Sequence, residues 1–345
     1  MDCRRGPGAM YLLAQGAVDS DEGILQKMDG LAGLKPKIML VLGSGCGDVA
    51  KNIDIKGTLP YSAIPHMPLS TVEGHEGNFI FGRYAGKEVI AFQGRQHFYE
   101  GYSPQEASFM VHVAKHLGVE AAIMTAAGGV APHAENVGSA GLERRYPARP
   151  GDLLLVRTVY PNFLPSSLRG PLVEGAGARF NGTMNMLSLY LNTIASSVAK
   201  REGIHLGECA YVPRQGPNYE TPLEVSLLSR LAQVARMPVI GGMSTVPELE
   251  AANALGIDSL ALVVVTNQMF DMRDRKGIEV CATGQFDLDE MGGSTVTLSE
   301  ARAAVQHLIK AYQPSHGEVT EQAGRVEVTE KLERLIGGVV RAVRF

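Results

Sequence analysis

The chain has 345 residues, and its 32 Lys and Arg against 36 Asp and Glu give a net charge of −4. A balance this close to neutral gives no electrostatic reason to expect nucleic acid or an anionic membrane as a partner. Hydrophobic residues make up 45% and charged residues 20% of the chain, which is typical of a globular protein with a full-sized core and excludes disorder and collagen-like repetition.

Targeting and cysteine signals favour a cytoplasmic protein. The four cysteines form no CxxC pair and have no metal-ligand spacing, which indicates reduced thiols. The longest apolar run, Leu260–Val265, is far shorter than the ~20 residues of a membrane span. No apolar stretch near the N-terminus is long enough for a secretion signal. We expect residues 1–24 to be a loose N-terminal segment.

Several short apolar runs, each ending in glycine or small polar residues, predict strands that are covered on both faces. They are Ile38–Leu42, Glu88–Gln93, Ala121–Thr125, Asp152–Arg157, Glu208–Val212, Pro238–Gly241 and Asp258–Thr266. Between them, capping-box patterns at Ser103, Thr221 and Thr245 predict helix starts, and an apolar stripe from Met184 to Val198 predicts another helix. Strands that alternate with helices indicate an α/β protein with a largely parallel or mixed sheet.

The chain shows one main domain, which we assign to residues 25–312. Within it, residues 131–149 are polar and rich in Gly and Pro, which predicts a surface insertion. Residues 313–345 form a C-terminal extension that ends in a helical pattern interrupted at Gly337 and Gly338.

Polar or glycine-rich segments follow five of the predicted strands. In α/β sheets ligands bind beyond the carboxyl ends of the strands, so we expect these segments to converge on one site. They are Gly43–Gly47, Gly94–Glu100, Thr125–Gly129, Gly242–Glu248 and Thr266-Asn267.

The glycine segment offers backbone N–H groups and the Ser44 hydroxyl to an anion. It lacks the third glycine of a dinucleotide fingerprint and the Gly-Lys-Ser/Thr of a Walker A loop, so a tight turn without a ligand is the alternative. Arg95 and His97 are two residues apart and would point to one side of an extended backbone, where they suit a phosphate. Their alternative is a salt bridge to Glu100 or another carboxylate.

Ser244 comes at the start of a predicted helix, and helix N-termini bind anions. With Ser44, Arg95, His97 and the Ala126 amide it predicts an oxyanion cradle. Glu220 precedes another predicted helix, where it either complements the helix dipole or accepts paired N–H donors from a flat heterocycle. Asn267 ends the most apolar predicted strand, where a buried amide requires hydrogen-bond partners.

This run of motifs resembles the trimeric, low-molecular-mass purine nucleoside phosphorylase family, in the family's order and over roughly residues 30–312. The motifs are Gly43-Ser-Gly45, Ser70-Thr-Val-Glu-Gly-His75, Gln93-Gly-Arg-Gln-His-Phe-Tyr-Glu-Gly101, Ala126-Ala-Gly-Gly129, Leu168-Arg-Gly-Pro171, Gly216-Pro-Asn-Tyr-Glu-Thr221, Gly242-Met-Ser-Thr-Val-Pro-Glu248 and Thr266-Asn267. The resemblance implies a single domain with a twisted mixed central sheet flanked by helices. It also implies a homotrimer that transfers the (deoxy)ribose of a purine nucleoside to inorganic phosphate in purine salvage, with no metal or organic cofactor.

The resemblance also implies a role for each matching residue. The implied phosphate ligands are Ser44, His75, Arg95, His97, Ala126 and Ser244. The implied ribose contacts are Tyr99, Met243 and, from a neighbouring subunit, Phe180. The implied purine contacts are Tyr219, Glu220, Thr266 and Asn267. The residues with implied catalytic roles are His75, His97, Glu220 and Asn267.

Asn267 together with Glu220 favours the 6-oxopurines of inosine and guanosine as substrate bases. A methylthioadenosine phosphorylase usually has aspartate where Asn267 stands, and a non-catalytic nucleoside-binding homologue is the further alternative. The chain departs from the family pattern at Tyr219, where phenylalanine is usual, and at Thr125, where asparagine is usual. It also has no histidine around residues 293–300 to contact the ribose 5′-hydroxyl.

Overall fold

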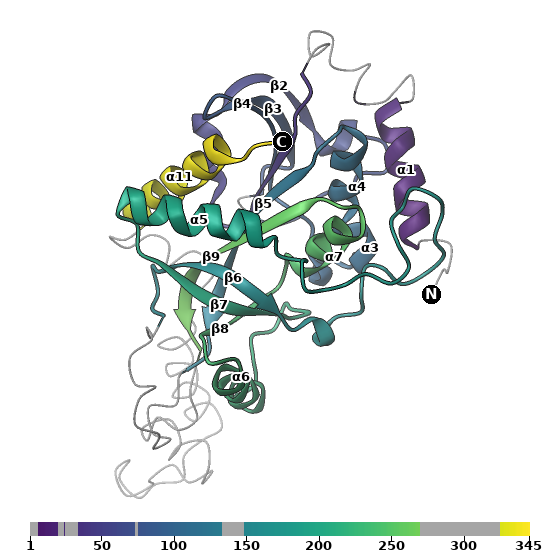
Figure 1. The fold of residues 1–345 in the computed structure, drawn as a ribbon. Coiled ribbons are helices and arrows are strands. Elements are labelled where there is room, and N and C mark those ends of the chain that lie inside the picture. Colours follow the sequence, from purple (N-terminus) through teal and green to yellow (C-terminus); the bar gives the residue numbers. More distant parts are fainter. Residues whose placement is uncertain (1–5, 20–23, 25–33, 73–74, 133–147, 270–324) are drawn as a thin grey trace, which may run out of the picture.

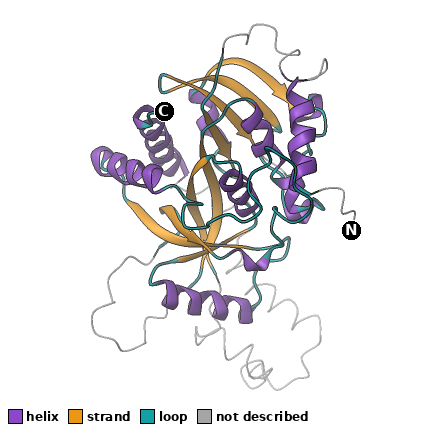
Figure 2. Cartoon of the chain, turned by 45° about the vertical axis from the view of Figure 1, so that its right-hand side comes forward, coloured by secondary structure: helices purple, strands orange, loops and turns teal. Residues whose placement is uncertain are grey.

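The computed structural model describes residues 6–19, 24, 34–72, 75–132, 148–269 and 325–345. These residues form a twisted nine-stranded mixed sheet with helices packed on both faces, as Figures 1 and 2 show. The α/β fold predicted from the sequence is confirmed. None of the helices within these residues is both long and apolar enough to span a bilayer.

The strands lie in the order β2-β3-β4-β1-β5-β8-β7-β6-β9, and β9 also pairs with β5. Their bounds are β1 (Ile38–Leu42), β2 (Asp54–Pro60), β3 (Asn78–Tyr84), β4 (Lys87–Gln93), β5 (Ala121–Val130), β6 (Leu153–Val159), β7 (Leu206–Pro213), β8 (Val239–Gly242) and β9 (Asp258–Gln268). The second pairing of β9 closes β5, β8, β7, β6 and β9 into a ring. Because β4, β1, β5 and β9 run parallel, their carboxyl ends meet at one edge of the sheet.

All the strands predicted from apolar runs are present, but β2 and β3 were missed. Strand β2 is mostly exposed, so it carries no apolar run, and Gly82 and Arg83 interrupt the apolar pattern of β3. Strand β5 continues to Val130, so the predicted loop Thr125–Gly129 belongs to the strand. Its glycines are paired rather than free, since Gly129 lies opposite both Gly241 and Asn267.

The helices are α1 (Pro7–Asp19), α3 (Pro104–Ala107), α4 (Phe109–His116), α5 (Leu189–Glu202), α6 (Pro222–Ala235), α7 (Val246–Ala254) and α11 (Arg325–Ala342). The capping boxes predicted at Ser103 and Thr221 are formed. The one predicted at Thr245 is wrong: this residue has φ +75° and its side chain does not cap the helix. The stripe from Met184 begins too early, because Ser188 caps α5 and Met184 is exposed.

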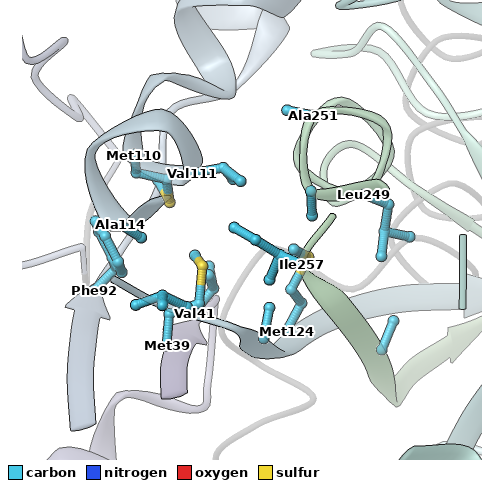
Figure 3. Packing of buried hydrophobic residues seen from close by; sticks show 14 of the residues in the cluster. Met39, Val41, Phe92, Met110, Val111, Ala114, Met124, Leu249, Ala251 and Ile257 are labelled. Atoms are coloured by element: carbon cyan, nitrogen blue, oxygen red, sulfur yellow. The ribbon is translucent and has the colours of Figure 1, made fainter. Parts of the chain in front are cut away.

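The core lies on both faces of the sheet, as the continuous apolar strands predict. Alternate residues of β1 enter different clusters, with Met39 and Val41 on one face and Ile38 and Leu40 on the other. Figure 3 shows the first cluster, where side chains of α4 and α7 pack on β1, β4 and β5. Helices α5 and α11 cover the opposite face (Figure 1).

Two expectations about the ends of the chain are wrong. Residues 7–19 of the expected loose segment form α1, whose Met10, Ala14 and Ala17 are buried in the core. Helix α11 continues through Gly337 and Gly338 instead of being interrupted. A Cβ on Gly338 would lie 2.4 Å from Val198 Cγ1, so this glycine is needed for the close approach of α11 to α5. Most of the predicted insertion, residues 133–147, lies outside the described residues.

Candidate active site

The glycine segment after β1 is held on both sides by the neighbouring strands. Leu42 accepts a hydrogen bond from the Gly94 N–H (3.0 Å), and the Gly43 N–H donates to the Thr125 hydroxyl (3.0 Å). A Cβ on Gly43 would lie 2.7 Å from the Thr125 carbonyl oxygen and 2.9 Å from Arg95 Nη2. The glycine segment is therefore a tight turn, and it packs directly against Arg95.

Arg95 is the key cation of this region and is only 1% exposed. Its Nη1 donates to Thr245 Oγ1 (2.8 Å) and to Glu248 Oε1 (3.2 Å), and its Nη2 donates to the Thr125 carbonyl. Glu248 is also 1% exposed, so the two form a buried ion pair. The salt bridge that the sequence left open for Arg95 exists, with Glu248 as the carboxylate. Arg95 Nε is buried and has no partner among the described residues.

Three rings are stacked beside Arg95. The His75 and His97 ring centroids are 5.1 Å apart, and those of His97 and Tyr99 are 4.8 Å apart. His75 Nε2 lies 3.2 Å from Ser44 Oγ, and its Nδ1 lies 3.0 Å from the Arg95 carbonyl oxygen. This contact network brings Ser44, His75, Arg95 and His97 together, as the sequence predicted.

The protonation of this stack is set by burial and by Glu100. Burial and the neighbouring His97 lower the pKa of His75 to about 4, so its ring is neutral at physiological pH. Burial acts to raise the pKa of Glu100, but hydrogen bonds from His97 and Thr71 outweigh it and lower the pKa to about 2. Glu100 is therefore ionised and lies 3.1 Å from His97 Nδ1, which leaves His97 Nε2 as the ring nitrogen that Glu100 does not contact.

Ser244 lies next to the residue that anchors Arg95. Its Oγ is 3.2 Å from Thr245 Oγ1, and its N–H donates to the Tyr211 hydroxyl (3.3 Å). Helix α7 begins two residues later, at Val246. Thr245 has a positive φ of 75°, and its hydroxyl contacts Arg95 instead of capping the helix.

Tyr99 and Met243 meet over Gly216. A Cβ on Gly216 would lie 2.6 Å from Met243 Sδ and 2.7 Å from Tyr99 Cδ1. Burial, Glu100 and the nearby Tyr219 raise the pKa of Tyr99 to about 12. The predicted ribose contacts Tyr99 and Met243 are thus close to the segment that carries Tyr219.

Glu220 and Asn267 lie on one face of the sheet over a pair of glycines. Gly129 and Gly241 are directly paired across β5 and β8, so both lack a side chain on the same face. A Cβ on Gly241 would lie 2.9 Å from Glu220 Oε1, and one on Gly129 would lie 3.0 Å from Asn267 Nδ2. The two glycines therefore make room for a carboxylate and an amide that are 47 positions apart in the sequence.

Both of these polar side chains are half-buried. Burial raises the pKa of Glu220, and the charge of Arg214 opposes this effect. Thr266 Oγ1 lies 3.0 Å from Asn267 Oδ1 and 3.2 Å from the Gly128 carbonyl oxygen. The Thr266 hydroxyl thus lies beside the oxygen of the Asn267 amide and does not contact the NH₂ group of that amide.

Of the remaining predicted site residues, Ala126 lies next to the Arg95 contacts and Phe180 lies apart from them. Ala126 is buried on β5, directly after the Thr125 carbonyl that holds Arg95. Phe180 is 93% exposed and is not part of the cluster formed by the other residues. The stretch 293–300 lies outside the described residues. No group of three or more His, Cys, Asp or Glu side chains within the described residues is arranged to hold a metal ion.

Sequence reasoning missed two residues of the site, Thr245 and Glu248. Their Thr-x-x-Glu spacing predicts a capping box, and the same two side chains instead bind Arg95. The available signal was an unpaired buried cation: an arginine predicted at a sheet edge needs a carboxylate, and Glu248 was a candidate.

Because Arg95 and Glu248 neutralise each other in the interior, removing one charge alone should be costly. We expect Arg95→Met to lower the free energy of unfolding by about 3–5 kcal/mol, because it leaves Glu248 buried and uncompensated. Adding Glu248→Gln to that variant should recover a large part of the loss. Urea denaturation of both variants tests this, and a double variant no more stable than Arg95→Met would contradict it.

Comparisons with known proteins identify the family of the chain. Residues 37–310 match the family model described as the Phosphorylase superfamily. The chain is 38% identical to purine nucleoside phosphorylase 1 of Geobacillus stearothermophilus, over 70% of this chain and 81% of that protein. It is 35% identical to the purine nucleoside phosphorylase of Bos taurus, over 68% and 77%. A crystal structure of the Schistosoma mansoni purine nucleoside phosphorylase with inosine has a TM-score of 0.70 at 25% identity, covering 99% of each chain. The chain belongs to the phosphorylase superfamily and, within it, to the purine nucleoside phosphorylases, enzymes that transfer a ribosyl group to phosphate.

Proposed function

We propose that the enzyme cleaves 6-oxopurine (deoxy)ribonucleosides, inosine and guanosine, with inorganic phosphate. The products are the free base and (deoxy)ribose 1-phosphate, and we assign the reaction to purine salvage in the cytoplasm. The observation that carries the proposal is the placement of Glu220 and Asn267 over the paired Gly129 and Gly241, beside the Arg95 region. Inorganic phosphate is the co-substrate, and we expect no metal or organic cofactor.

The phosphate is proposed to bind among Ser44, His75, Arg95, His97, Ala126 and Ser244. Arg95 and His97 supply donors, and the hydroxyls of Ser44 and Ser244 and the Ala126 amide complete the cradle. Arg95 is held by Thr125, Thr245 and Glu248 before any anion arrives. A donor group that is already fixed costs no reorganisation when charge develops in the transition state.

The reaction breaks the N9–C1′ bond and forms a bond between C1′ and a phosphate oxygen. The electron pair of the broken bond stays on the purine, and positive charge develops on the sugar. Phosphate below the sugar stabilises that charge and attacks C1′. Asn267 would bind N7 and O6 of the leaving base as it gains negative charge or a proton, so its hydrogen bonds strengthen in the transition state.

We propose that Glu220 binds the N1 edge of the base. As a carboxylate it accepts from N1–H of a 6-oxopurine and, in guanine, from the exocyclic amine. Adenine has a bare lone pair at N1, so Glu220 would face another acceptor. A site built around such paired hydrogen bonds can reject the wrong partner by ~10⁴-fold or more.

Two rival functions remain distinguishable. A methylthioadenosine phosphorylase-like activity would require a preference for 6-aminopurines, for which an aspartate at position 267 is the usual residue. A non-catalytic nucleoside-binding protein would need no phosphate site, and so would have no use for a buried Arg95 close to the Ser44–His75 pair. Phosphate-dependent release of hypoxanthine from inosine separates catalysis from binding alone.

We expect kcat/KM for inosine to exceed that for adenosine by at least ~10²-fold, because a buried polar group left without a partner costs about 1–3 kcal/mol. Asn267→Asp should move the ratio towards adenosine, because a carboxylate accepts from the N6 amine and repels O6. The substitution keeps the oxygen that lies beside Thr266. Steady-state kinetics with both nucleosides measure the ratio, and the phosphate KM of each variant is the control.

Equal turnover of adenosine and inosine by the wild-type enzyme would contradict the assignment of Glu220 and Asn267. Crystal complexes of the Schistosoma mansoni enzyme exist with both inosine and adenosine. Binding alone therefore does not test base choice, and kcat/KM does.

The raised pKa of Glu220 gives a second test through pH. Glu220 must be ionised to accept N1–H, so kcat/KM for inosine should fall as the pH drops through this raised pKa. Arg214→Met removes the charge that opposes the rise and should move the acidic limb to higher pH. Glu224→Gln removes a carboxylate that raises the Glu220 pKa while keeping a capping-box side chain, so it should move the limb to lower pH. Limbs that stay in place in both variants would remove Glu220 from base recognition.

We further propose a homotrimer in which Phe180 of one subunit completes the ribose site of the next. Phe180 is almost fully exposed although the surrounding segment is anchored: Glu250 accepts from the Ser166 hydroxyl and the Ser167 N–H, and Arg179 donates to the Gly170 carbonyl. A large apolar ring displayed by an anchored segment suits an interface.

Mixing two defective chains tests this sharing. Phe180→Ala and Glu220→Gln should each lose most activity as pure proteins, while coexpression should restore part of it because some mixed sites carry both native residues. Light scattering at the assay concentration gives the oligomeric state. A fully active monomer, or mixed chains with no more activity than the two pure variants, would contradict the shared site.

A further inference from the structure

Thr125 lies where the hydrogen-bonded ladder between β1 and β5 ends. The last backbone pair of that ladder joins Val41 to Met124. One residue further, the Thr125 hydroxyl donates to the Val41 carbonyl (2.9 Å) and accepts from the Gly43 N–H (3.0 Å). Through these two hydrogen bonds, the buried Thr125 side chain continues the ladder into the glycine segment that carries Ser44.

The backbone of the same residue fixes Arg95. The Thr125 carbonyl accepts from Arg95 Nη2, opposite Nη1, which Thr245 and Glu248 hold. The Arg95 guanidinium thus donates hydrogen bonds to the sheet on one side and to the start of α7 on the other. The next residue along β5 is Ala126, whose amide belongs to the proposed cradle.

These contacts leave little room for independent movement. A Cβ on Gly43 would lie 2.7 Å from the Thr125 carbonyl oxygen and 2.9 Å from Arg95 Nη2, so the glycine segment, Thr125 and Arg95 touch one another. A displacement of Thr125 therefore shifts three parts of the cradle together: the Ser44 segment, the guanidinium and the Ala126 amide.

The hydroxyl distinguishes this role from that of an ordinary core residue. Valine has nearly the same shape and would fill the same space, but it would leave the buried Gly43 N–H without its partner and would remove the hydroxyl contact to the Val41 carbonyl. Core packing alone gives no reason for a polar atom that both donates and accepts at this position.

We propose that Thr125 is a positioning residue for phosphate: its hydroxyl sets the glycine segment and its carbonyl sets Arg95, so that the anion meets a preformed cradle. The inference rests on the proposed function, because it assumes that the anion bound there is the phosphate of the reaction.

The experiment compares Thr125→Val, which removes the hydroxyl, with Thr125→Ser, which keeps it. Ile123→Val is the matched control, because Ile123 is a buried residue on the same strand and loses only a methylene group. For each variant we would measure the phosphate KM at saturating inosine and the inosine KM at saturating phosphate. The rise in melting temperature caused by inorganic phosphate alone gives a readout that needs no turnover.

Thr125→Val should raise the phosphate KM by about tenfold or more, the equivalent of ~1.4 kcal/mol, and should shrink the phosphate-induced rise in melting temperature. The inosine KM should change much less, Thr125→Ser should recover most of the phosphate affinity, and Ile123→Val should keep it. A phosphate KM for Thr125→Val within about twofold of wild type, or equal rises in both KM values, would overturn the proposal. A wild-type enzyme that binds phosphate but does not cleave inosine would overturn the proposed function instead, while the melting-temperature comparison would still decide the role of Thr125.

Discussion

The burial of the Arg95 guanidinium is the constraint on which the site depends. A cation that is 1% exposed must be matched by charge and by hydrogen bonds, or the fold loses several kcal/mol. The match comes from two segments that are distant from Arg95 in the sequence: the Thr125 carbonyl within β5, and the side chains of Thr245 and Glu248 at the start of α7. Meeting the needs of this one side chain therefore also fixes β5 and α7 relative to the end of β4.

A second constraint acts where the strands β5, β8 and β9 meet. Gly129 of β5 is paired with Gly241 of β8 on one side and with Asn267 of β9 on the other. Two of these three residues have no Cβ atom. The space that side chains would fill is taken by the Glu220 carboxylate and the Asn267 amide. Alanine at Gly241 or Gly129 would place its methyl group 2.9 Å from Glu220 Oε1 or 3.0 Å from Asn267 Nδ2. Both distances are shorter than an ordinary van der Waals contact. The two glycines are thus required for the packing of the Glu220 and Asn267 side chains against the sheet.

The sequence predicted the elements whose pattern is local. Continuous apolar runs located the buried strands, and the capping boxes at Ser103 and Thr221 located two helix starts. It could not distinguish the capping box expected at Thr245 from an anchor for Arg95, because both use a hydroxyl and a carboxylate three residues apart. The choice between them depends on a cation 150 positions earlier, which a local pattern does not contain. The same reason hides the extension of β5 through its glycines, since their pairing partners lie on β8 and β9.

The burial of the site residues differs between its two halves, and the difference suits two kinds of ligand. Where we propose that phosphate binds, His75, Arg95, His97 and Ala126 are buried, while Ser44 and Ser244 are half-buried. Tyr99, Met243, Tyr219, Glu220 and Asn267 are only half-buried. Phosphate is small and strongly hydrated, so a cradle must offer rigid donors to replace its water at little entropic cost. A nucleoside is larger and apolar on its faces, and it can bury the half-exposed aromatic and thioether groups itself. On the proposed assignment, most of the side chains around phosphate are fixed by burial, and those around the nucleoside are left for the ligand's own apolar surface to cover.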